Sequence, residues 1–223
     1  MTKMDQILEY SLEAGRIMLE SNSEIYRAEE VIVNVCHAFG IENIDVFTLA
    51  TCIYLSINKD GQSYTRVKRI YKRETNLARI SKVNSLSRSI VRKDYTLEEF
   101  KKELEKIENY KGLPHFQRAV TMGASCGVFG LMFVPTATYL DFIITFLITL
   151  VIYYGMVFLT KYELNAFISN ALLSIVMTVL AAIGVNYHIA SDIDTIVIGT
   201  IMILVPGVAV TNAVRDVING DIL

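Results

Sequence analysis

Four apolar segments in the second half of this 223-residue chain restrict what it can fold into. A helix needs roughly 20 apolar residues to cross a hydrocarbon core of about 30 Å. Each segment approaches that length, and charged residues such as Asp141, Lys161 and Glu163 fall in the short stretches between them. One such segment fits the core of a soluble protein, but four in series predict a transmembrane bundle. The predicted spans are residues 119–138, 142–160, 166–187 and 193–214.

The distribution of basic residues divides the chain into two parts. Of its 21 Lys and Arg residues, only Lys161 and Arg215 follow residue 118. Loops rich in Lys and Arg stay on the cytoplasmic side of a membrane, so the first half is expected in the cytoplasm. The N-terminus shows no secretory signal. We therefore predict a multi-pass protein of the inner (cytoplasmic) cell membrane, with a cytosolic domain at residues 1–113 and a transmembrane helical domain at residues 114–223.

The first half has the pattern of a soluble α+β domain. Apolar residues at helical spacing, followed by β-branched stretches around a Gly-containing turn, predict two helices, a hairpin and two more helices. Ser21-Asn22-Ser23 is expected to break the first helical stretch and to cap the second helix. Thr96, with Glu99 three residues later, forms the pattern of a capping box. The predicted elements are helices within residues 6–39, strands 46–57 and 63–71 around Asn58-Lys59-Asp60-Gly61, and helices 77–91 and 97–107.

Residues 66–93 hold ten basic side chains, and Glu74 is the single acidic residue among them. A solvated domain face is one interpretation. Attraction to the anionic cytoplasmic leaflet is another, worth about 1 kcal/mol for each basic residue near the surface. Nucleic-acid binding is not expected, because no recognition motif accompanies the charge.

The last apolar segment contains a helix break and polar residues. Pro206-Gly207 interrupts it, and broken helices of this kind mark substrate sites in many transporters, although a tolerated kink remains an alternative. Helical spacing places Thr211, Asn212 and Arg215 on one side, with Asp216 one turn from Asn212. Charged side chains at bilayer depth usually face a cavity and a partner. These two charges are equally compatible with the end of a span at the cytoplasmic interface.

Small residues in the first span, Gly123 and Gly127 above all, predict close helix packing. Four short-looped spans with such faces indicate an oligomer.

The string LVPGVAVTNAVRDVINGD, which runs to Asp221, resembles the "VPG…TN..RD…GD" element of the threonine/serine exporter family. AGRIMLESNSEIYRAEE (Ala14–Glu30) resembles a helix pair of that family. Thr51 with its apolar run, and the stretch from Thr65 to Leu77, resemble two further elements. Asn22 stands where the family often has Gly, and Ala50 and Cys52 flank Thr51 where Pro and Gly are usual. The family is expected to have a fifth span.

The resemblance implies export of threonine and serine, or of dicarboxylates, through a membrane subunit that acts with a smaller membrane subunit of the same family. It implies no catalytic residue, no metal and no cofactor. In this interpretation Arg215 binds a substrate carboxylate, and Asp216 and Asp141 pair with an amino group or carry a proton. Pro206 and Gly207 shape the break, and Thr211 and Asn212 supply polar contacts.

Two other functions remain open. One is a tethered enzyme, although no GxSxG, HExxH or P-loop spacing occurs in the sequence. The other is a membrane-anchored assembly or sensing module. Tyr26, Arg27, Glu29 and Glu30 form a polar helix face, which we interpret as solvated or as a contact between subunits.

Overall fold

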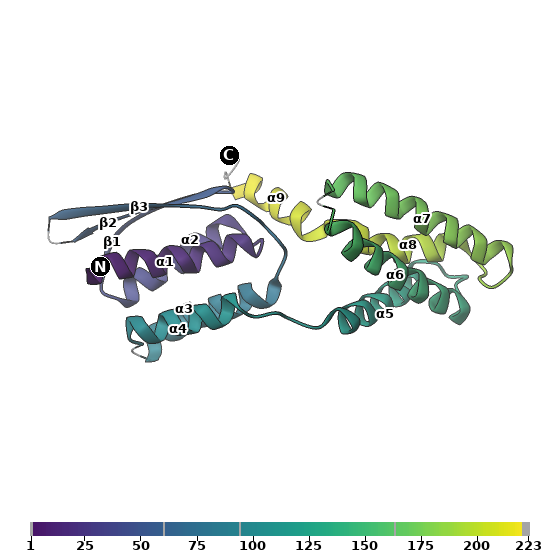
Figure 1. Ribbon diagram of the computed structural model, residues 1–223, viewed down its shortest axis with the longest axis horizontal. Helices are drawn as coiled ribbons and strands as arrows, with labels where there is room; N and C mark the ends of the chain where they lie inside the picture. The colour runs from purple at the N-terminus through teal and green to yellow at the C-terminus, as the bar shows by residue number, and fades with distance from the viewer. Residues whose placement is uncertain (1, 60, 94, 163, 220–223) are drawn as a thin grey trace. The chain divides into compact units, whose positions relative to one another are not determined.

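The computed structural model describes residues 2–59, 61–93, 95–162 and 164–219. Asp60 of the predicted turn, the loop residue Glu163 and the Gly220-Asp221 pair of the family element lie outside these ranges. The chain forms two compact units (Figure 1). The first unit contains the residues up to Gly112 together with the segment from Gly207 onward, and the second unit is Leu113–Pro206. The predicted split into a cytosolic domain at residues 1–113 and a transmembrane domain at residues 114–223 stays a prediction, and the contact-based units assign the segment after residue 206 to the first unit.

The first unit combines helices with one small sheet. Its helices are α1 (Lys3–Glu20), α2 (Ile25–Ala38), α3 (Leu77–Lys93), α4 (Leu97–Glu108) and α9 (Gly207–Asn219). Its strands are β1 (Asn43–Leu49), β2 (Cys52–Lys59) and β3 (Gln62–Arg69), which form an antiparallel sheet in the order β1-β2-β3.

The single strand predicted at residues 46–57 is wrong, because the chain reverses inside it. Leu49 pairs with Cys52, so Ala50-Thr51 is a two-residue connection between β1 and β2. β-Branched and aromatic residues continue on both sides of this connection, and it contains neither Gly nor Pro. The usual local signals of a hairpin turn are therefore missing from the sequence.

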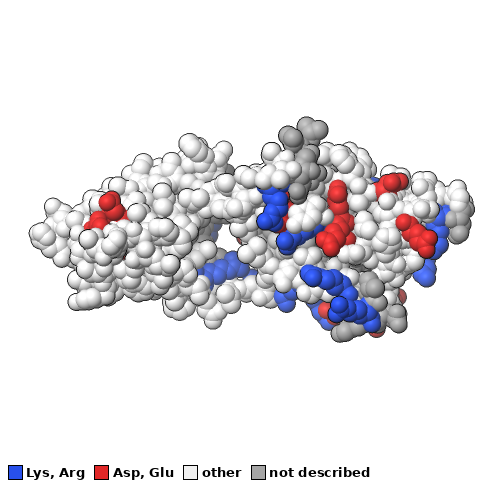
Figure 2. All heavy atoms as spheres, turned by 180° about the vertical axis from the view of Figure 1, so that it is seen from behind, with Lys and Arg blue, Asp and Glu red and all other residues white. Residues whose placement is uncertain are grey.

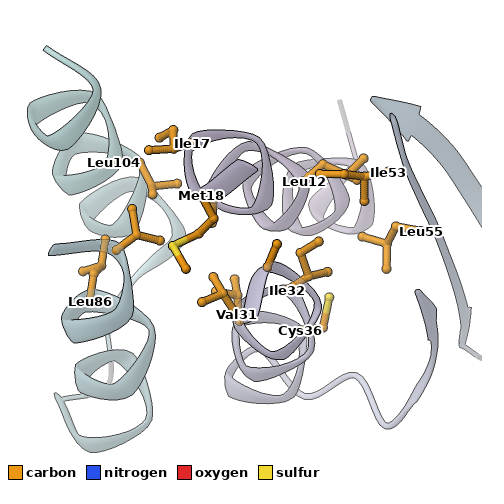
Figure 3. Close-up of a cluster of buried hydrophobic side chains, with 14 of the residues drawn as sticks. Leu12, Ile17, Met18, Val31, Ile32, Cys36, Ile53, Leu55, Leu86 and Leu104 are labelled. Carbon is orange, nitrogen blue, oxygen red and sulfur yellow. The ribbon is translucent and has the colours of Figure 1, made fainter. Parts of the chain in front are cut away.

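The core of the first unit lies between the sheet and helices α1 to α4. Ile53, Leu55 and Ile57 alternate along β2, so all three side chains point to one face, where they are fully buried. Figure 3 shows Ile53 and Leu55 beside Leu12 of α1 and near Ile32 of α2. At the other end of the cluster, side chains of α3 and α4 pack near Met18 and Ile17 (Figure 3).

The helix boundaries confirm one predicted cap and correct another. Thr96 and Glu99 form the capping box of α4, with the Glu99 N–H donating to Thr96 Oγ1 at 3.3 Å. The break at residues 21–23 is also present, but α2 begins after Glu24, and no side chain caps its backbone.

Asn22 has a φ of 66°. Asn and Gly tolerate this left-handed conformation best, which explains why either residue serves at this position.

Several basic side chains of residues 66–93 form ion pairs or hydrogen bonds within the first unit. Arg66 pairs with Asp5 at 2.9 Å, and Lys68 pairs with Glu13 at 2.8 Å. Arg79 donates to the carbonyl oxygen of Glu108 at 2.7 Å. These side chains therefore stabilise the fold, and fewer of them are available to a lipid surface than the sequence count indicates.

The second unit consists of four helices: α5 (His115–Phe133), α6 (Tyr139–Thr160), α7 (Ala166–Asn186) and α8 (Ile193–Leu204). Among the described residues, α6 and α7 are long and apolar enough to cross a membrane, and α8 with α9 adds a third candidate if the pair is one broken span. α5 ends at Phe133 rather than at residue 138, because Val134 precedes Pro135 and takes an extended conformation. The count of four spans stays a prediction.

Small residues let the helices of the second unit approach closely. A Cβ atom on Gly123 or Gly127 would lie 3.2 Å from a backbone oxygen of α6, which confirms the predicted close packing. Figure 2 shows one face of the molecule, where charged side chains gather over the first unit and the helices of the second unit carry almost none. This uncharged surface suits a lipid environment.

Candidate functional site

The candidate site forms where side chains of α9 contact the segment that joins α1 to α2, inside the first unit. Val205 is extended before Pro206, and α9 begins at Gly207. Proline lacks a backbone N–H and clashes with a preceding helical turn, so a new helix starts after it. Along α9, Asn212 and Arg215 turn toward the chain segment that joins α1 to α2.

Two contacts hold α9 against this segment. The side-chain amide of Asn212 donates to the carbonyl oxygen of Asn22 at 2.8 Å. The guanidinium of Arg215 forms an ion pair with the carboxylate of Glu24. Glu24 also pairs with Arg27 Nε at 3.0 Å, and its side chain is only 11% exposed. One nearly buried carboxylate therefore lies between two arginines.

An open groove of about 1010 Å³ runs beside this ion pair. Tyr26 and Glu29 of α2 form one wall, and α9 forms the other. The lining residues from α9 are Val210, Thr211, Val214, Arg215 and Ile218. Arg215 keeps 52% of its side chain exposed, so its guanidinium is accessible to a solute in spite of the ion pair. The groove thus offers a cation and a carboxylate on opposite walls, with apolar side chains between them.

Glu29 and Thr211 line the groove, and each already forms hydrogen bonds within the first unit. One carboxylate oxygen of Glu29 accepts a hydrogen bond from the Thr48 N–H at 2.8 Å, which fixes the side chain against β1. The Thr211 hydroxyl donates to the carbonyl oxygens of Gly207 and Val208, at 2.9 and 3.0 Å. The hydroxyl oxygen of Thr211 can still accept from a ligand. Pro206 and Gly207 precede the groove and do not line it.

Asp216 interacts electrostatically with Arg73. Burial lowers the pKa of Arg73, and the negative charge of Asp216 acts in the opposite direction. Arg73 is held in place by the carbonyl oxygens of Leu19 and Ser23, at 3.1 and 3.4 Å. Asp216 therefore balances the charge of Arg73, and it is not among the residues that line the groove.

Asp141, the remaining predicted site residue, belongs to the second unit. Its Oδ2 accepts from the N–H and the hydroxyl of Thr138, at 2.7 and 2.8 Å. Its Oδ1 accepts from the N–H groups of Ser191 and Asp192, at 2.7 and 3.3 Å. The carboxylate is fully buried and accepts two hydrogen bonds at each oxygen. This arrangement caps α6 and joins it to the segment before α8.

The structure brings Arg215 and Thr211 to the groove and leaves Asp216, Asp141, Pro206 and Gly207 outside its lining. Tyr26 and Glu29 belong to the helix face that the sequence indicated only as solvated or as a contact between subunits. The sequence signal for these two residues was that polar helix face, of which Tyr26 and Glu29 line the groove, whereas Arg27 and Glu30 line a different pocket. The described residues contain no group of three or more His, Cys, Asp and Glu side chains that could hold a metal ion.

The amino-acid sequence is similar to those of known membrane transport proteins over nearly its whole length. The model of the threonine/serine exporter family matches residues 9–223. The "Probable succinate transporter subunit YjjP" of Klebsiella aerogenes is 22% identical over 214 residues, which cover 95% of this chain and 81% of the relative. The protein of the same name in Escherichia coli K12 is also 22% identical, over 95% of this chain and 82% of its own length. No solved structure matches the chain.

Proposed function

Because the chain belongs to the threonine/serine exporter family, we propose that it is a subunit of a two-component exporter that moves threonine or serine out of the cell. It acts with a smaller membrane subunit of the same family. The relatives named as succinate transporter subunits make a dicarboxylate the second candidate substrate, and their names support the assignment as one subunit of an assembly.

The opposite charges across the groove carry this proposal. Arg215 on α9 faces the substrate carboxylate, since a guanidinium offers paired donors to a carboxylate. Glu29 on α2 then receives the α-ammonium group. A dicarboxylate would place its second negative charge near Glu29, where like charges repel. The groove therefore favours a zwitterionic amino acid over succinate.

The ion pair with Glu24 does not prevent Arg215 from binding a substrate. A guanidinium carries five N–H donors, so one edge can hold Glu24 while another contacts a second carboxylate. The Tyr26 hydroxyl and the Thr211 hydroxyl oxygen stand beside Arg215 and suit the side-chain hydroxyl of threonine or serine. This gives each polar group of the substrate a complementary group in the groove.

In the membrane arrangement that we propose, the first unit is cytoplasmic and the apolar helices of the second unit cross the inner membrane in an oligomer. The Lys and Arg asymmetry of the sequence supports this orientation. On α9, Val210, Val214, Val217 and Ile218 are exposed. Val210, Val214 and Ile218 also line the groove, so in this proposal the apolar side of α9 faces the bound substrate rather than lipid.

The test is efflux of preloaded labelled threonine, serine and succinate from cells that express the full chain with and without the smaller subunit. We expect partner-dependent efflux of threonine or serine that Arg215→Ala abolishes and Arg215→Lys weakens. Arg92→Ala, which removes an exposed arginine from α3, is the matched control and should leave efflux unchanged. Efflux of succinate alone would replace the substrate assignment. Inserted protein without efflux in any pairing would favour the assembly or sensing module.

A further inference from the structure

A second, more polar pocket opens between α2 and α3 in the first unit. Its volume is about 270 Å³, and most of its lining surface is polar. The lining residues are Tyr26, Arg27, Glu30 and Asn34 of α2, with Asn84, Ser87 and Arg88 of α3. Two arginines, one glutamate and two amides thus line a small hollow, and convergent charged and amide groups of this kind can fix the orientation of a polar ligand.

The arginines of this pocket are anchored in a way that leaves donors available. Arg27 makes its contacts through Nε, to the Tyr26 hydroxyl at 3.2 Å and to Glu24 at 3.0 Å. Arg88 also uses Nε, which donates to the carbonyl oxygen of Asn84 at 3.3 Å. Within the described part of the chain, no hydrogen bond engages the terminal nitrogens of either guanidinium. Each arginine therefore presents two terminal NH₂ groups that suit a carboxylate.

The other polar groups of the pocket form few direct contacts with one another. Among the described residues, Glu30 forms no direct ion pair, and the side-chain amides of Asn34 and Asn84 form no hydrogen bond. The charge of Glu30 nevertheless acts on Arg27 and contributes, after the hydrogen bond with the neighbouring tyrosine, to the raised pKa of that guanidinium. Both asparagines are half-buried, and Ser87 is buried with its hydroxyl donating to the Asn84 carbonyl oxygen at 3.0 Å. Polar side chains that are partly withdrawn from water gain most from a ligand that restores their hydrogen bonds.

We propose that this pocket binds an acidic α-amino acid, a ligand with two carboxylates and one ammonium group. Its lining carries two positive charges and one negative charge, which is the complement of such a ligand. Arg27 and Arg88 each bind one carboxylate, and Glu30 binds the ammonium group. Glu24 lies outside the lining, and its ion pair with Arg27 offsets part of the positive charge of that arginine. The same carboxylate also pairs with Arg215, so its charge is divided between two arginines and Arg27 keeps a net attraction for an anion.

The pocket shares one residue with the groove beside α9. Tyr26 lines both, and its hydroxyl accepts the hydrogen bond from Arg27. A ligand that draws Arg27 toward its carboxylate changes the position of Tyr26 at the groove. The pocket is therefore placed to sense an acidic amino acid in the same compartment as the first unit, and its binding chemistry does not depend on the export function.

Isothermal titration calorimetry on the purified full chain in detergent tests the proposal. The probes are L-aspartate and L-glutamate, with glutarate, which lacks the ammonium group, and L-glutamine, which lacks the second carboxylate. We expect L-aspartate or L-glutamate to bind about tenfold or more tightly than either control ligand, because an unmade charged hydrogen bond costs at least that much. Arg88→Gln and Glu30→Gln should each weaken this binding by a similar factor.

Two further variants show where the ligand binds. Lys102→Gln removes an exposed charge from α4 outside the pocket, and Arg215→Ala removes the cation of the groove. Both should retain binding of the acidic amino acid. Equal affinity for glutarate, or loss of binding in Arg215→Ala but not in Arg88→Gln, would overturn the proposal. So would the absence of heat up to about 10 mM ligand with protein whose thermal unfolding is cooperative.

Discussion

Arg215 of α9 and Glu24 at the start of α2 form an ion pair although 191 residues separate them in the sequence. Together with the hydrogen bond from Asn212 to Asn22, this pair joins the segment after the Pro206 break to the N-terminal unit. The family element around residues 204–221 and the helix pair at Ala14–Glu30 are thus in direct contact. This contact is a structural reason for the two family elements to occur in the same chain.

Replacing each member of this pair separates a structural role from substrate binding. Glu24→Gln removes the ion pairs with both Arg215 and Arg27, and it should cost about 1–2 kcal/mol of stability because each pair with a partly exposed arginine contributes little. It also releases Arg215 for the substrate, so the KM for efflux should fall. Arg215→Ala removes only one of these pairs and should lose about 0.5–1 kcal/mol of stability together with efflux itself. Thermal unfolding measures the change in stability, and efflux kinetics measure the change in KM. If both variants lose efflux equally, the ion pair serves the fold and does not bind the substrate.

The packing of the second unit predicts a steric effect at Gly130. A Cβ atom there would lie 2.6 Å from the carbonyl oxygen of Thr195, and a backbone atom cannot move aside as a side chain can. Gly130→Ala should therefore force α5 away from α8 and cost about 1–3 kcal/mol, the usual range for overpacking. Thermal unfolding of the detergent-solubilised chain measures this cost.

Gly155→Ala is the matched control for this steric effect. A Cβ atom at Gly155 would meet only the terminal methyl group of Leu173, which can rotate away. This substitution should leave the unfolding temperature nearly unchanged or raise it, since Ala favours a helix over Gly. An equal loss of stability in both variants would show that the approach of α5 to α8 does not depend on Gly130.

Asp141 should act on stability rather than on substrate affinity. In Asp141→Asn, one carboxylate oxygen becomes an NH₂ group that faces N–H donors, so the loss is about 1–3 kcal/mol. The KM for efflux, measured on inserted protein, should stay unchanged. Asp194→Asn, at an exposed acid beside the same segment, should alter neither quantity. A large rise in KM with normal stability would instead place Asp141 on the substrate path.

Local signals explain which parts of the fold were predictable. The capping box of Thr96 and Glu99 and the apolar runs of α6 and α7 act within one helix, so the sequence is enough to find them. The turn at Ala50-Thr51 was missed because β-forming residues flank it without a break. In the site, Arg215 and Thr211 belong to the family element near the end of the sequence, and Glu24 and Glu29 belong to the matched helix pair. Their proximity to α9 depends on contacts between distant segments, which no local pattern records.

The pH dependence of the first unit should centre on Glu13. Burial raises the pKa of Glu13, but hydrogen bonds from Arg16 and Lys68 outweigh this effect and hold the pKa below its ordinary value of 4.5. A lowered carboxylate pKa stabilises the fold above the unfolded-state pKa, and this contribution is lost as pH falls through the folded-state pKa. The unfolding temperature of the full chain should therefore drop below about pH 4.5.

Glu13→Gln should remove part of this acid sensitivity while lowering stability at neutral pH. Glu9→Gln is the control, because Glu9 is more exposed and its oxygen lies 3.9 Å from Arg66. It should leave both the neutral stability and the acid dependence close to those of the unmodified chain. If Glu9→Gln and Glu13→Gln shift the pH profile equally, the acid sensitivity comes from the general charge of α1 and not from the contacts of Glu13 with Arg16 and Lys68.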